Sequence, residues 1–391
     1  MDSYTQRAWA QVSLDAIASN LQQIRRMTRK EAQIMAVVKA DAYGHGFLQV
    51  ARTLLENGAD AFAVAMLEEA KQLRSRGIDV PVLILGNTNR DLCEDLIDYG
   101  VMPTVFSYDM AKALSNMAVK KNKDAKLHIK LDTGMSRIGF LCDEKHAPDT
   151  IREIKRIASL PNLEIDGIFT HLSCADEDEG AYTRMQFERF MHICDSLQNE
   201  GVQIGKRHVC NSAALVLYPE MQLDMVRPGV ILYGLHPSSL TEGKIELQSA
   251  MSLKARVTLV KRVEEKIGVS YGKEYITNPP DTLATIPIGY ADGYSRLLAG
   301  KAGMLWRGRR LPVVGRICMD QCMIDATNAD NIEVDDIVTI MGSDGGACIS
   351  ASDLAHEMGT INYEIVCLIG KRIPRIYTSK GEVVRALNNL V

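Results

Sequence analysis

The chain has 391 residues, of which 46% are hydrophobic and 24% are charged, and its formal net charge is −4 at pH 7. This length exceeds one average domain, so we expect two domains with an ordinary globular core. The slightly acidic balance, without any basic tract, argues against nucleic acid or an anionic membrane as the main partner. No apolar run approaches the roughly 18 residues of a membrane helix.

The nine cysteines are odd in number and widely scattered, so they do not indicate a disulfide framework. Cys318 and Cys322 lie four positions apart, but no second pair completes a zinc site. The first residues lead into no apolar segment of the kind that secretion signals carry. We therefore expect a reduced, cytoplasmic protein without a metal site.

The first 235 residues alternate between apolar, β-branched runs and amphipathic helical stretches. Strands are predicted near 33–39, 61–66, 81–86, 102–106, 126–132, 164–170, 207–211 and 225–233. Helices are predicted at 14–27, 47–57, 67–77, 108–119, 146–159 and 182–200. This alternation favours an α/β fold, a (β/α)8 TIM-type barrel. A doubly wound sheet is the alternative, but no Gly-x-Gly-x-x-Gly follows the first strand.

A connection rich in Pro, Ser and Gly follows at 236–247, and alternating strands predominate after it. Strands are predicted at 253–263, 282–288, 303–315, 322–326, 336–341 and 364–377, with one amphipathic helix around 350–358. We therefore predict a barrel domain over 14–240 and a mainly-β domain over 241–391. Residues 9–14 are expected to form an extra strand ahead of the first helix.

Polar residues follow several of the predicted barrel strands. In such barrels the chemistry lies at the C-terminal ends of the strands. The residues at or near those ends are Lys39, Lys130, His171, Asn211, Ser212 and Arg227. The strand pattern therefore predicts that they share one rim of the barrel.

Lys39 comes directly after the apolar run 34–38. A lysine at the end of a buried strand is costly unless its charge is removed or paired. A Schiff base with a carbonyl cofactor removes that charge, and burial lowers a lysine pKa towards the free amine that this chemistry needs. The alternative is a lysine whose stem follows the apolar surface while its ammonium group reaches solvent.

The segment around this lysine is Val37-Val38-Lys39-Ala40-Asp41-Ala42-Tyr43-Gly44-His45-Gly46. It resembles the cofactor-lysine signature of alanine racemases, which bind pyridoxal 5′-phosphate (PLP). Eight more matching segments follow in order, so the resemblance covers nearly the whole chain: 130–139, Thr170-His171-Leu172, Asn211-Ser212, Arg227-Pro228-Gly229 with Tyr233-Gly234, Val269-Ser270-Tyr271-Gly272, 289–294, Cys318-Met319-Asp320 and Asn362-Tyr363-Glu364.

The resemblance implies a homodimeric racemase with one catalytic base on each face of the substrate. Lys39 would carry the cofactor and act on the D-enantiomer, and Tyr271 of the partner subunit would act on the L-enantiomer. A free tyrosine has a pKa of about 10, so a positive neighbour would have to lower it. Arg137 and His171 are the implied candidates for that neighbour. The N-terminal residues 1–13 would join the C-terminal β domain.

Arg227 matches the arginine that faces the pyridine nitrogen. A guanidinium keeps its proton, so that nitrogen would stay unprotonated and the ring would be a weaker electron sink than in most PLP enzymes. The residues implied to hold the phosphate or to line the cofactor are Tyr43, Leu85, Asn211, Ser212, Gly229, Val230 and Tyr363. Those implied to bind the substrate are Arg137, Met319, Asp320 and Tyr290, with Arg296, Arg316 and Asp176 along the access corridor.

The segment 130–139 contains two distinctive positions, Lys130 and Ser136. In many relatives the lysine at Lys130 is carbamylated, and the resulting anion orients the following arginine. An ordinary ion pair between Lys130 and a carboxylate is the alternative. Ser136 stands where many relatives carry glycine, and because serine is small we expect Arg137 to stay in place.

Other functions of the same or related folds remain possible from the residues alone. A serine or broader-specificity racemase is the nearest alternative, and the bulk of Tyr363 beside the substrate methyl argues for alanine. A related decarboxylase is disfavoured because its cysteine-containing motifs are missing. A non-catalytic PLP-binding protein would share the barrel and its lysine, but the β domain with Tyr271 argues against it.

Overall fold

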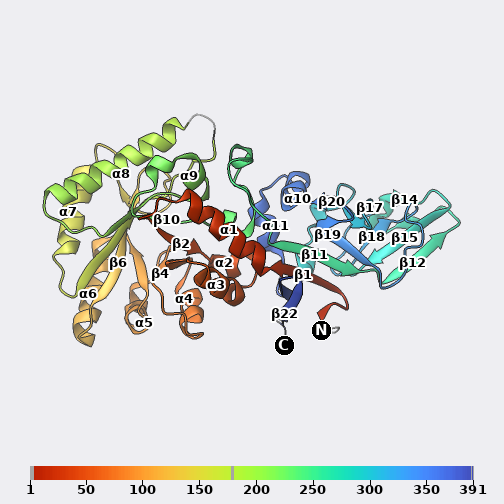
Figure 1. The fold of residues 1–391 in the computed structure, drawn as a ribbon, viewed down its shortest axis with the longest axis horizontal. Coiled ribbons are helices and arrows are strands. Elements are labelled where there is room, and N and C mark those ends of the chain that lie inside the picture. Colours follow the sequence, from red (N-terminus) through yellow and green to blue (C-terminus); the bar gives the residue numbers. More distant parts are fainter. Residues whose placement is uncertain (1–3, 178–179, 389, 391) are drawn as a thin grey trace. The chain divides into compact units, whose positions relative to one another are not determined.

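The computed structural model describes residues 4–177, 180–388 and 390 (Figure 1). The chain divides into two compact units. The unit that we call the barrel unit contains Ala18–Ala42 and Val50–Leu247, and the C-terminal unit contains the chain up to Ile17, Tyr43–Gln49 and everything from Gln248 onward. Each unit is described by itself.

The barrel unit is built on eight parallel strands in the order β10-β2-β3-β4-β5-β6-β8-β9, with the short β7 (Phe140–Leu141) beside β6. The strands form a nearly closed barrel, which confirms the predicted (β/α)8 architecture. Their bounds are β2 Gln33–Val37, β3 Ala61–Val64, β4 Val82–Ile84, β5 Met102–Val105, β6 Ala125–Asp132, β8 Leu163–Phe169, β9 Lys206–His208 and β10 Met225–Val226.

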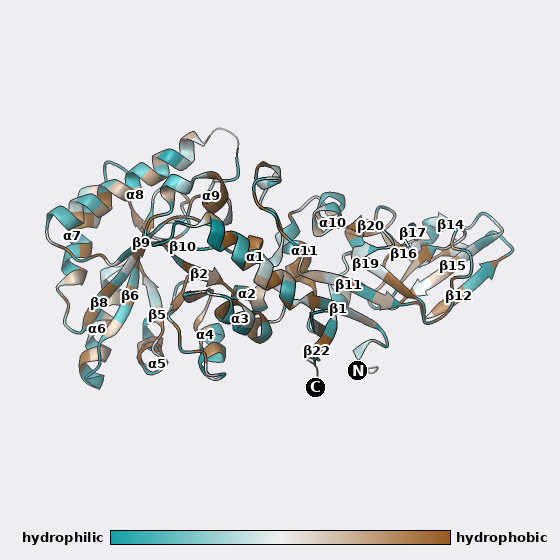
Figure 2. Cartoon of the chain, in the orientation of Figure 1, coloured by the Kyte–Doolittle hydropathy of each residue, from teal (hydrophilic) through white to brown (hydrophobic). Residues whose placement is uncertain are grey.

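The helices of this region are amphipathic and cover the strands, so hydrophilic and hydrophobic residues mix along them (Figure 2). Their bounds are α1 Leu14–Met27, α3 Phe47–Glu56, α4 Leu67–Arg74, α5 Cys93–Asp98, α6 Tyr108–Lys121, α7 Ala147–Ala158, α8 Ala181–Asn199 and α9 Ser212–Leu217. Helices α5 and α9 were not predicted, because six residues are too few to show a helical period.

The C-terminal unit is organised around a sheet in the order β12-β15-β18-β17-β16-β19-β11-β1-β21-β22, with β20 beside β19. Strand β1 (Ala8–Ser13) pairs antiparallel with β11 and parallel with β21. The other strands are β11 Met251–Arg256, β12 Leu259–Val263, β15 Asp281–Ile286, β16 Gly303–Trp306, β17 Arg309–Val314, β18 Cys322–Asp325, β19 Ile337–Asp344, β20 Ala347–Ile349, β21 Arg375–Ser379 and β22 Glu382–Leu387. A separate hairpin joins β13 (Gly268–Val269) to β14 (Tyr275–Ile276).

Three predicted stretches of this unit differ from the structure. The stretch 253–263, predicted as one strand, is divided between β11 and β12. The stretch 303–315 is a hairpin of β16 and β17, because Arg307 and Gly308 both have positive φ (48° and 81°) and form a tight turn. The stretch predicted as a strand at 364–377 begins as the helix α11 (Asn362–Leu368), which follows α10 (Ala351–Met358). Ile365 and Val366 are buried while Cys367 is exposed, so only one face of this helix is covered.

Candidate active site

Lys39 lies just beyond β2 and begins an unusual turn of the backbone. The four residues that follow it, Ala40 to Tyr43, have φ between 52° and 54°, which is the left-handed region. Such a conformation costs about 1–2 kcal/mol for each residue with a side chain, so surrounding contacts must hold it. The amide of Ala40 donates to Glu69 Oε1 at 2.7 Å, and the other oxygen of Glu69 accepts from Ala65 at 2.7 Å. Glu69 was not predicted as a site residue.

Arg227 follows β10 and is almost completely buried, with 3% of its surface exposed. Its Nη1 donates to His208 Nδ1 and to the His208 carbonyl, both at 2.8 Å, and its Nη2 donates to the Thr170 carbonyl at 2.7 Å. Within the described residues it forms no ion pair with a carboxylate. Burial lowers the pKa of Arg227 to about 10, which leaves it charged at neutral pH. The barrel unit therefore contains a buried cation whose hydrogen-bond partners, among the described residues, include no carboxylate.

Lys130 lies on β6 and is also buried, with 5% exposed. Its Nζ lies 4.7 Å from the centre of the Phe169 ring, and in the described part of the chain no carboxylate forms an ion pair with it. Burial, followed by the charges of Arg227 and Arg137, lowers the pKa of Lys130 well below its usual value. The ordinary ion pair considered from the sequence is therefore not formed by these residues, and the amine tends to be neutral.

The loop that leads to Arg137 is held by side chains that bind its backbone. Asp132 Oδ1 accepts from the amides of Gly134 and Ser136, each at 3.0 Å. Tyr182 donates to the Gly134 carbonyl at 2.7 Å. Ser136 has a φ of 57°, in the left-handed region that glycine enters without penalty. This accounts for glycine in many relatives, and the serine is accommodated at a local energetic cost.

His171 follows β8 and is kept neutral by its surroundings. Burial and then the positive charges of Arg227, Lys130, Arg137 and Lys39 lower the pKa of His171 well below its usual value. A neutral imidazole cannot supply the positive charge that would lower the pKa of a tyrosine base. Of the two candidates for that role, only Arg137 carries a charge.

The residues expected near a phosphate in the barrel unit lie beside each other. Asn211 caps α9, because its Oδ1 accepts from the amide of Ala214 at 2.9 Å. Ser212 Oγ accepts from the amide of Gly229 at 2.8 Å. The turn of 3-10 helix that begins at Val230 follows at once, and its first amides have no partner inside the helix. Leu85 directly follows β4, where its amide donates to the Val64 carbonyl at 2.8 Å.

Two further residues expected near the phosphate belong to the C-terminal unit. The rings of Tyr43 and Tyr363 lie 6.3 Å apart between centres and are tilted by 47°. Burial raises the pKa of Tyr43, so its phenol stays protonated and can donate a hydrogen bond. Gly44 has a φ of 78°, and a Cβ there would lie 2.3 Å from the Val366 carbonyl oxygen. Glycine at this position therefore allows the segment to lie against α11.

Tyr271, Tyr290 and Met319 lie on three loops that are in contact within the C-terminal unit, and we call these residues the Tyr271 cluster. The Ser270 hydroxyl donates to the Arg316 carbonyl at 2.7 Å, and the amide of Ala291 donates to the Met319 carbonyl at 3.0 Å. All three side chains of the cluster are exposed, by 71%, 43% and 52%. The structure thus brings together the loops that carry a base candidate and two substrate-site candidates, with all three side chains exposed.

Asp320, expected near the substrate, and Arg316, expected along the corridor, each form an ion pair. Asp320 pairs with Arg372 at 2.8 Å, and Arg316 pairs with Glu274. Arg296 is exposed, and Asp176, in the barrel unit, is half-buried. Lys39 and Tyr271 belong to different units.

Comparison with known proteins decides the family. Residues 12–237 match the family model of the alanine racemase N-terminal domain, and residues 250–377 match that of the C-terminal domain. The chain belongs to the alanine racemase family. An alanine racemase from Clostridium tetani is 46% identical to it over 390 residues, covering 99% of this chain and 100% of the relative. One from Methanococcus maripaludis is 47% identical over 370 residues, covering 94% and 98%.

Solved structures of alanine racemases agree with this assignment. The structure from Clostridium difficile 630 is 38% identical, covers 99% of this chain and 100% of its own, and has a TM-score of 0.94. The Bacillus anthracis structure with bound L-Ala-P is 36% identical, covers 99% of both chains and has a TM-score of 0.91. This alanine racemase family member is therefore an enzyme, an isomerase that acts on amino acids.

Three further properties concern the thiols, metal sites and membrane-spanning helices of the described residues. All nine cysteines are free thiols. No cluster of three or more His, Cys, Asp or Glu side chains in 4–177, 180–388 and 390 is arranged to hold a metal ion. Within the same residues, no helix has both the length and the apolar character that a membrane crossing requires.

Proposed function

We propose that this family member interconverts L-alanine and D-alanine with PLP as its cofactor. The observation that carries the proposal is Arg227, a buried guanidinium without a carboxylate partner among the described residues. It follows β10, which pairs in parallel with β2, the strand before Lys39. Both residues therefore lie at the C-terminal ends of neighbouring strands, where such barrels place their chemistry.

The candidate residues of the two units fit PLP chemically. Lys39 would attach the cofactor covalently, and Arg227 would donate to the pyridine nitrogen. The phosphate would be bound by Tyr43, Ser212, Tyr363 and the amides at Gly229 and Val230, since hydroxyls and helix-start amides form anion sites. Gly229 already donates to Ser212, so the amide of Val230 and the hydroxyls are the better candidates. Asn211 and Leu85 would line the cofactor.

Racemisation requires that an α-proton leave one face of the substrate and return on the other. When bound, PLP supplies an electron sink for the charge that this proton leaves behind. Lys39 would remove the proton of D-alanine, and Tyr271 that of L-alanine. Arg137, the charged candidate beside the cofactor, would assist this transfer. The Met319 amide with Asp320 and Tyr290 would bind and orient the substrate.

Tyr271 would act from the partner subunit of a homodimer. The exposed Tyr271 cluster supports this proposal, because its loops contact one another and leave three large apolar side chains uncovered, as an interaction site would. A dimer with a twofold axis would give each of two sites one Lys39 and one Tyr271. The proposed domains, 14–240 and 1–13 with 241–391, would then supply one base each.

Lys130 is proposed to be carbamylated. A neutral, buried amine can attack carbon dioxide, forming a nitrogen–carbon bond and losing one proton, which leaves an anionic carbamate. This anion would lie near the uncompensated charges of Arg227 and Arg137, both of which depress the pKa of Lys130. The modification would convert an unfavourable cluster of cations into a balanced one.

Labelling with 13C-bicarbonate tests this modification. We expect a carbamate carbon signal in the wild-type protein that is absent from Lys130→Arg. Lys126 provides the matched control because it lies on the same strand, and its hydrogen bonds to Asp166 and Glu164 raise its pKa. Lys126→Arg should keep the signal. A signal that survives in Lys130→Arg, or its absence from the wild type, would contradict the proposal.

The activity itself is tested by measuring D-enantiomer formation from L-alanine and from L-serine, each with added PLP. We expect alanine to be the better substrate, because the bulk of Tyr363 would leave little room beside the substrate methyl. Faster turnover of serine would retain the reaction class and refute the Tyr363 argument. Bound cofactor without any racemisation would favour a non-catalytic PLP-binding protein.

The proposed biological role is the supply of D-alanine for peptidoglycan, which is the role that the family resemblance suggests in a bacterium. A cytoplasmic location is proposed with it. Nine free thiols are compatible with a reducing compartment.

A further inference from the structure

A chain of polar side chains crosses the interior of the barrel, starting at Arg227. Arg227 Nη1 lies 2.8 Å from His208 Nδ1, and His208 Nε2 lies 2.8 Å from His128 Nδ1. His128 Nε2 then lies 3.5 Å from Asp166 Oδ2. Neither histidine is exposed. The chain therefore connects the rim that holds Lys39 with a carboxylate on the far side of the barrel.

The direction of these hydrogen bonds follows from the arginine. A guanidinium can only donate, so His208 Nδ1 must be unprotonated and must accept. A neutral His208 then carries its proton on Nε2 and donates it to His128 Nδ1. A neutral His128 in turn carries its proton on Nε2, where it faces the carboxylate of Asp166. Burial lowers the pKa of both histidines, which agrees with two neutral rings.

The surrounding residues hold both rings in these positions. The ring of His208 stacks on Phe169, with 4.9 Å between centres and an angle of 7°. Gly167 is paired with His128 in the sheet, and a Cβ at Gly167 would lie 2.5 Å from the imidazole. The middle strand β8 thus provides a stacking surface for one ring and space for the other.

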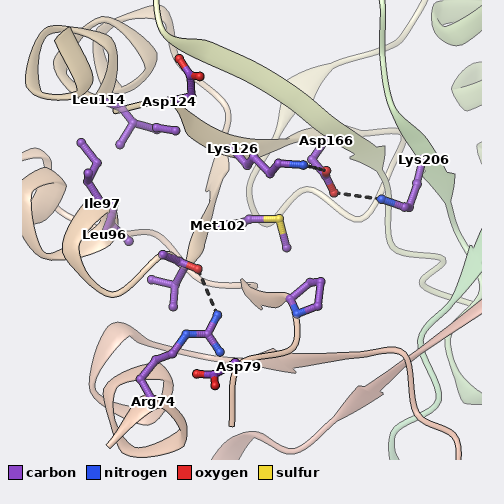
Figure 3. Close-up of a pocket in the computed structure, with 14 residues that line it drawn as sticks. Arg74, Asp79, Leu96, Ile97, Met102, Leu114, Asp124, Lys126, Asp166 and Lys206 are labelled. Atoms are coloured by element: carbon purple, nitrogen blue, oxygen red, sulfur yellow. Dashed lines mark hydrogen bonds and ion pairs between the residues drawn. The ribbon is translucent and has the colours of Figure 1, made fainter. Parts of the chain in front are cut away.

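Asp166 is the charged end of the chain. It lies beside a cavity of about 390 Å³ near the N-terminal ends of the barrel strands, between Lys126 and Lys206 (Figure 3). The two ammonium groups lie 2.9 Å and 3.2 Å from its carboxylate oxygens. His128 and then the two lysines lower the pKa of Asp166, so it remains an acceptor at every pH where the enzyme would work.

We infer that Asp166 is a positioning residue for the catalytic site, acting on Arg227 through His128 and His208. Its negative charge faces the His128 Nε2 proton and makes His128 Nδ1 a better acceptor, which polarises His208 in the same direction. His208 Nδ1 then binds Arg227 more strongly and fixes the guanidinium where the pyridine nitrogen would lie. The catalytic consequence rests on the proposed function, but the hydrogen-bond coupling does not.

Nuclear magnetic resonance of protein labelled with 15N-histidine tests the coupling without cofactor or substrate. In the wild type we expect unprotonated Nδ1 and protonated Nε2 atoms for both histidines, with the His208 Nε2 proton shifted downfield. Asp166→Ala should move this proton upfield and shift the His208 Nδ1 resonance. Glu164→Gln is the control, because Glu164 pairs with the same Lys126 and has no contact with His128. Unchanged His208 resonances in Asp166→Ala would overturn the inference.

Activity provides the second readout. Asp166→Ala should lower kcat on the order of 10-fold with little change in KM. Losses of this size are typical when a residue that orients a ligand-binding side chain is removed. Asp166→Asn keeps an oxygen acceptor for His128 and should recover part of both effects. If Asp166→Asn and Glu164→Gln lowered kcat by the same factor, this result would contradict a role of Asp166 through His128. If the wild type fails to racemise, the resonance shifts still decide the coupling.

Discussion

Replacing Lys39 by alanine is expected to abolish racemisation and to remove the visible absorption of the bound cofactor. One substitution removes the proposed covalent attachment and one of the two bases, so turnover should fall by about 10⁴-fold or more. Chiral chromatography of the product and an absorption spectrum with equal added PLP would measure both effects. The left-handed turn that follows Lys39 is a backbone feature and should persist.

Lys71→Ala is a suitable control for this experiment. Lys71 lies on α4 and pairs with Asp95 at 2.6 Å, away from the proposed site residues. We expect wild-type absorption and turnover from this variant. Visible absorption that persists in Lys39→Ala would show that another lysine holds the cofactor.

Replacing Tyr271 by phenylalanine is expected to remove only the base that acts on L-alanine. Racemisation should fall by about 10²–10⁴-fold, because a single oxygen that transfers the proton is lost. The cofactor absorption should stay unchanged. In deuterated water, exchange of the α-proton of D-alanine should continue through Lys39, whereas exchange in L-alanine should collapse. Equal loss of exchange from both enantiomers would contradict the assignment of separate bases.

Tyr275→Phe is the matched control, because this tyrosine lies on the same hairpin and its hydroxyl makes a long hydrogen bond, of 3.5 Å, to Asp281 Oδ2. Its turnover should match the wild type. Mixing the two inactive variants, Lys39→Ala and Tyr271→Phe, tests the shared site directly. Random exchange of subunits should restore roughly a quarter of the wild-type sites, as a twofold symmetric dimer requires. Activity that never recovers on exchange would indicate that each chain completes its own site.

Most barrel strands were predictable because they are largely buried and appear as short apolar, β-branched runs, whereas β9 is Lys-Arg-His and only its last residue is buried. Each of the eight predicted runs overlaps an observed strand, but the run 225–233 contains only the two-residue β10 and ends in a turn of 3-10 helix. The short helices α5 and α9 were missed, and α11 was predicted as a strand. In these segments too few residues sample the helical period, so apolar content alone misleads.

The site was predictable to the level of which residues lie at one rim. Lys39, Lys130, His171 and Arg227 each follow or end a parallel strand, and parallel strands share their direction. The supporting hydrogen bonds of Glu69, Asp132 and Tyr182 could not be predicted from the sequence. Each of them involves a backbone group of a loop, and the conformation of the loop decides whether the two groups meet. Nor could the left-handed φ of Ser136 be known, although its glycine-like position in the matched segment was a signal.

By itself, the sequence determined the family of this protein, its barrel, and the identity of the groups that can do chemistry. These depend on local residue types and on their order along the chain. Only the tertiary structure decided the charge states and the hydrogen-bond directions. His171 is neutral because burial and the surrounding positive charges lower its pKa, and Arg227 is linked to Asp166 because His128 and His208, 80 positions apart, meet across β8. Burial and through-space distance set these properties, and neither is a local function of the sequence.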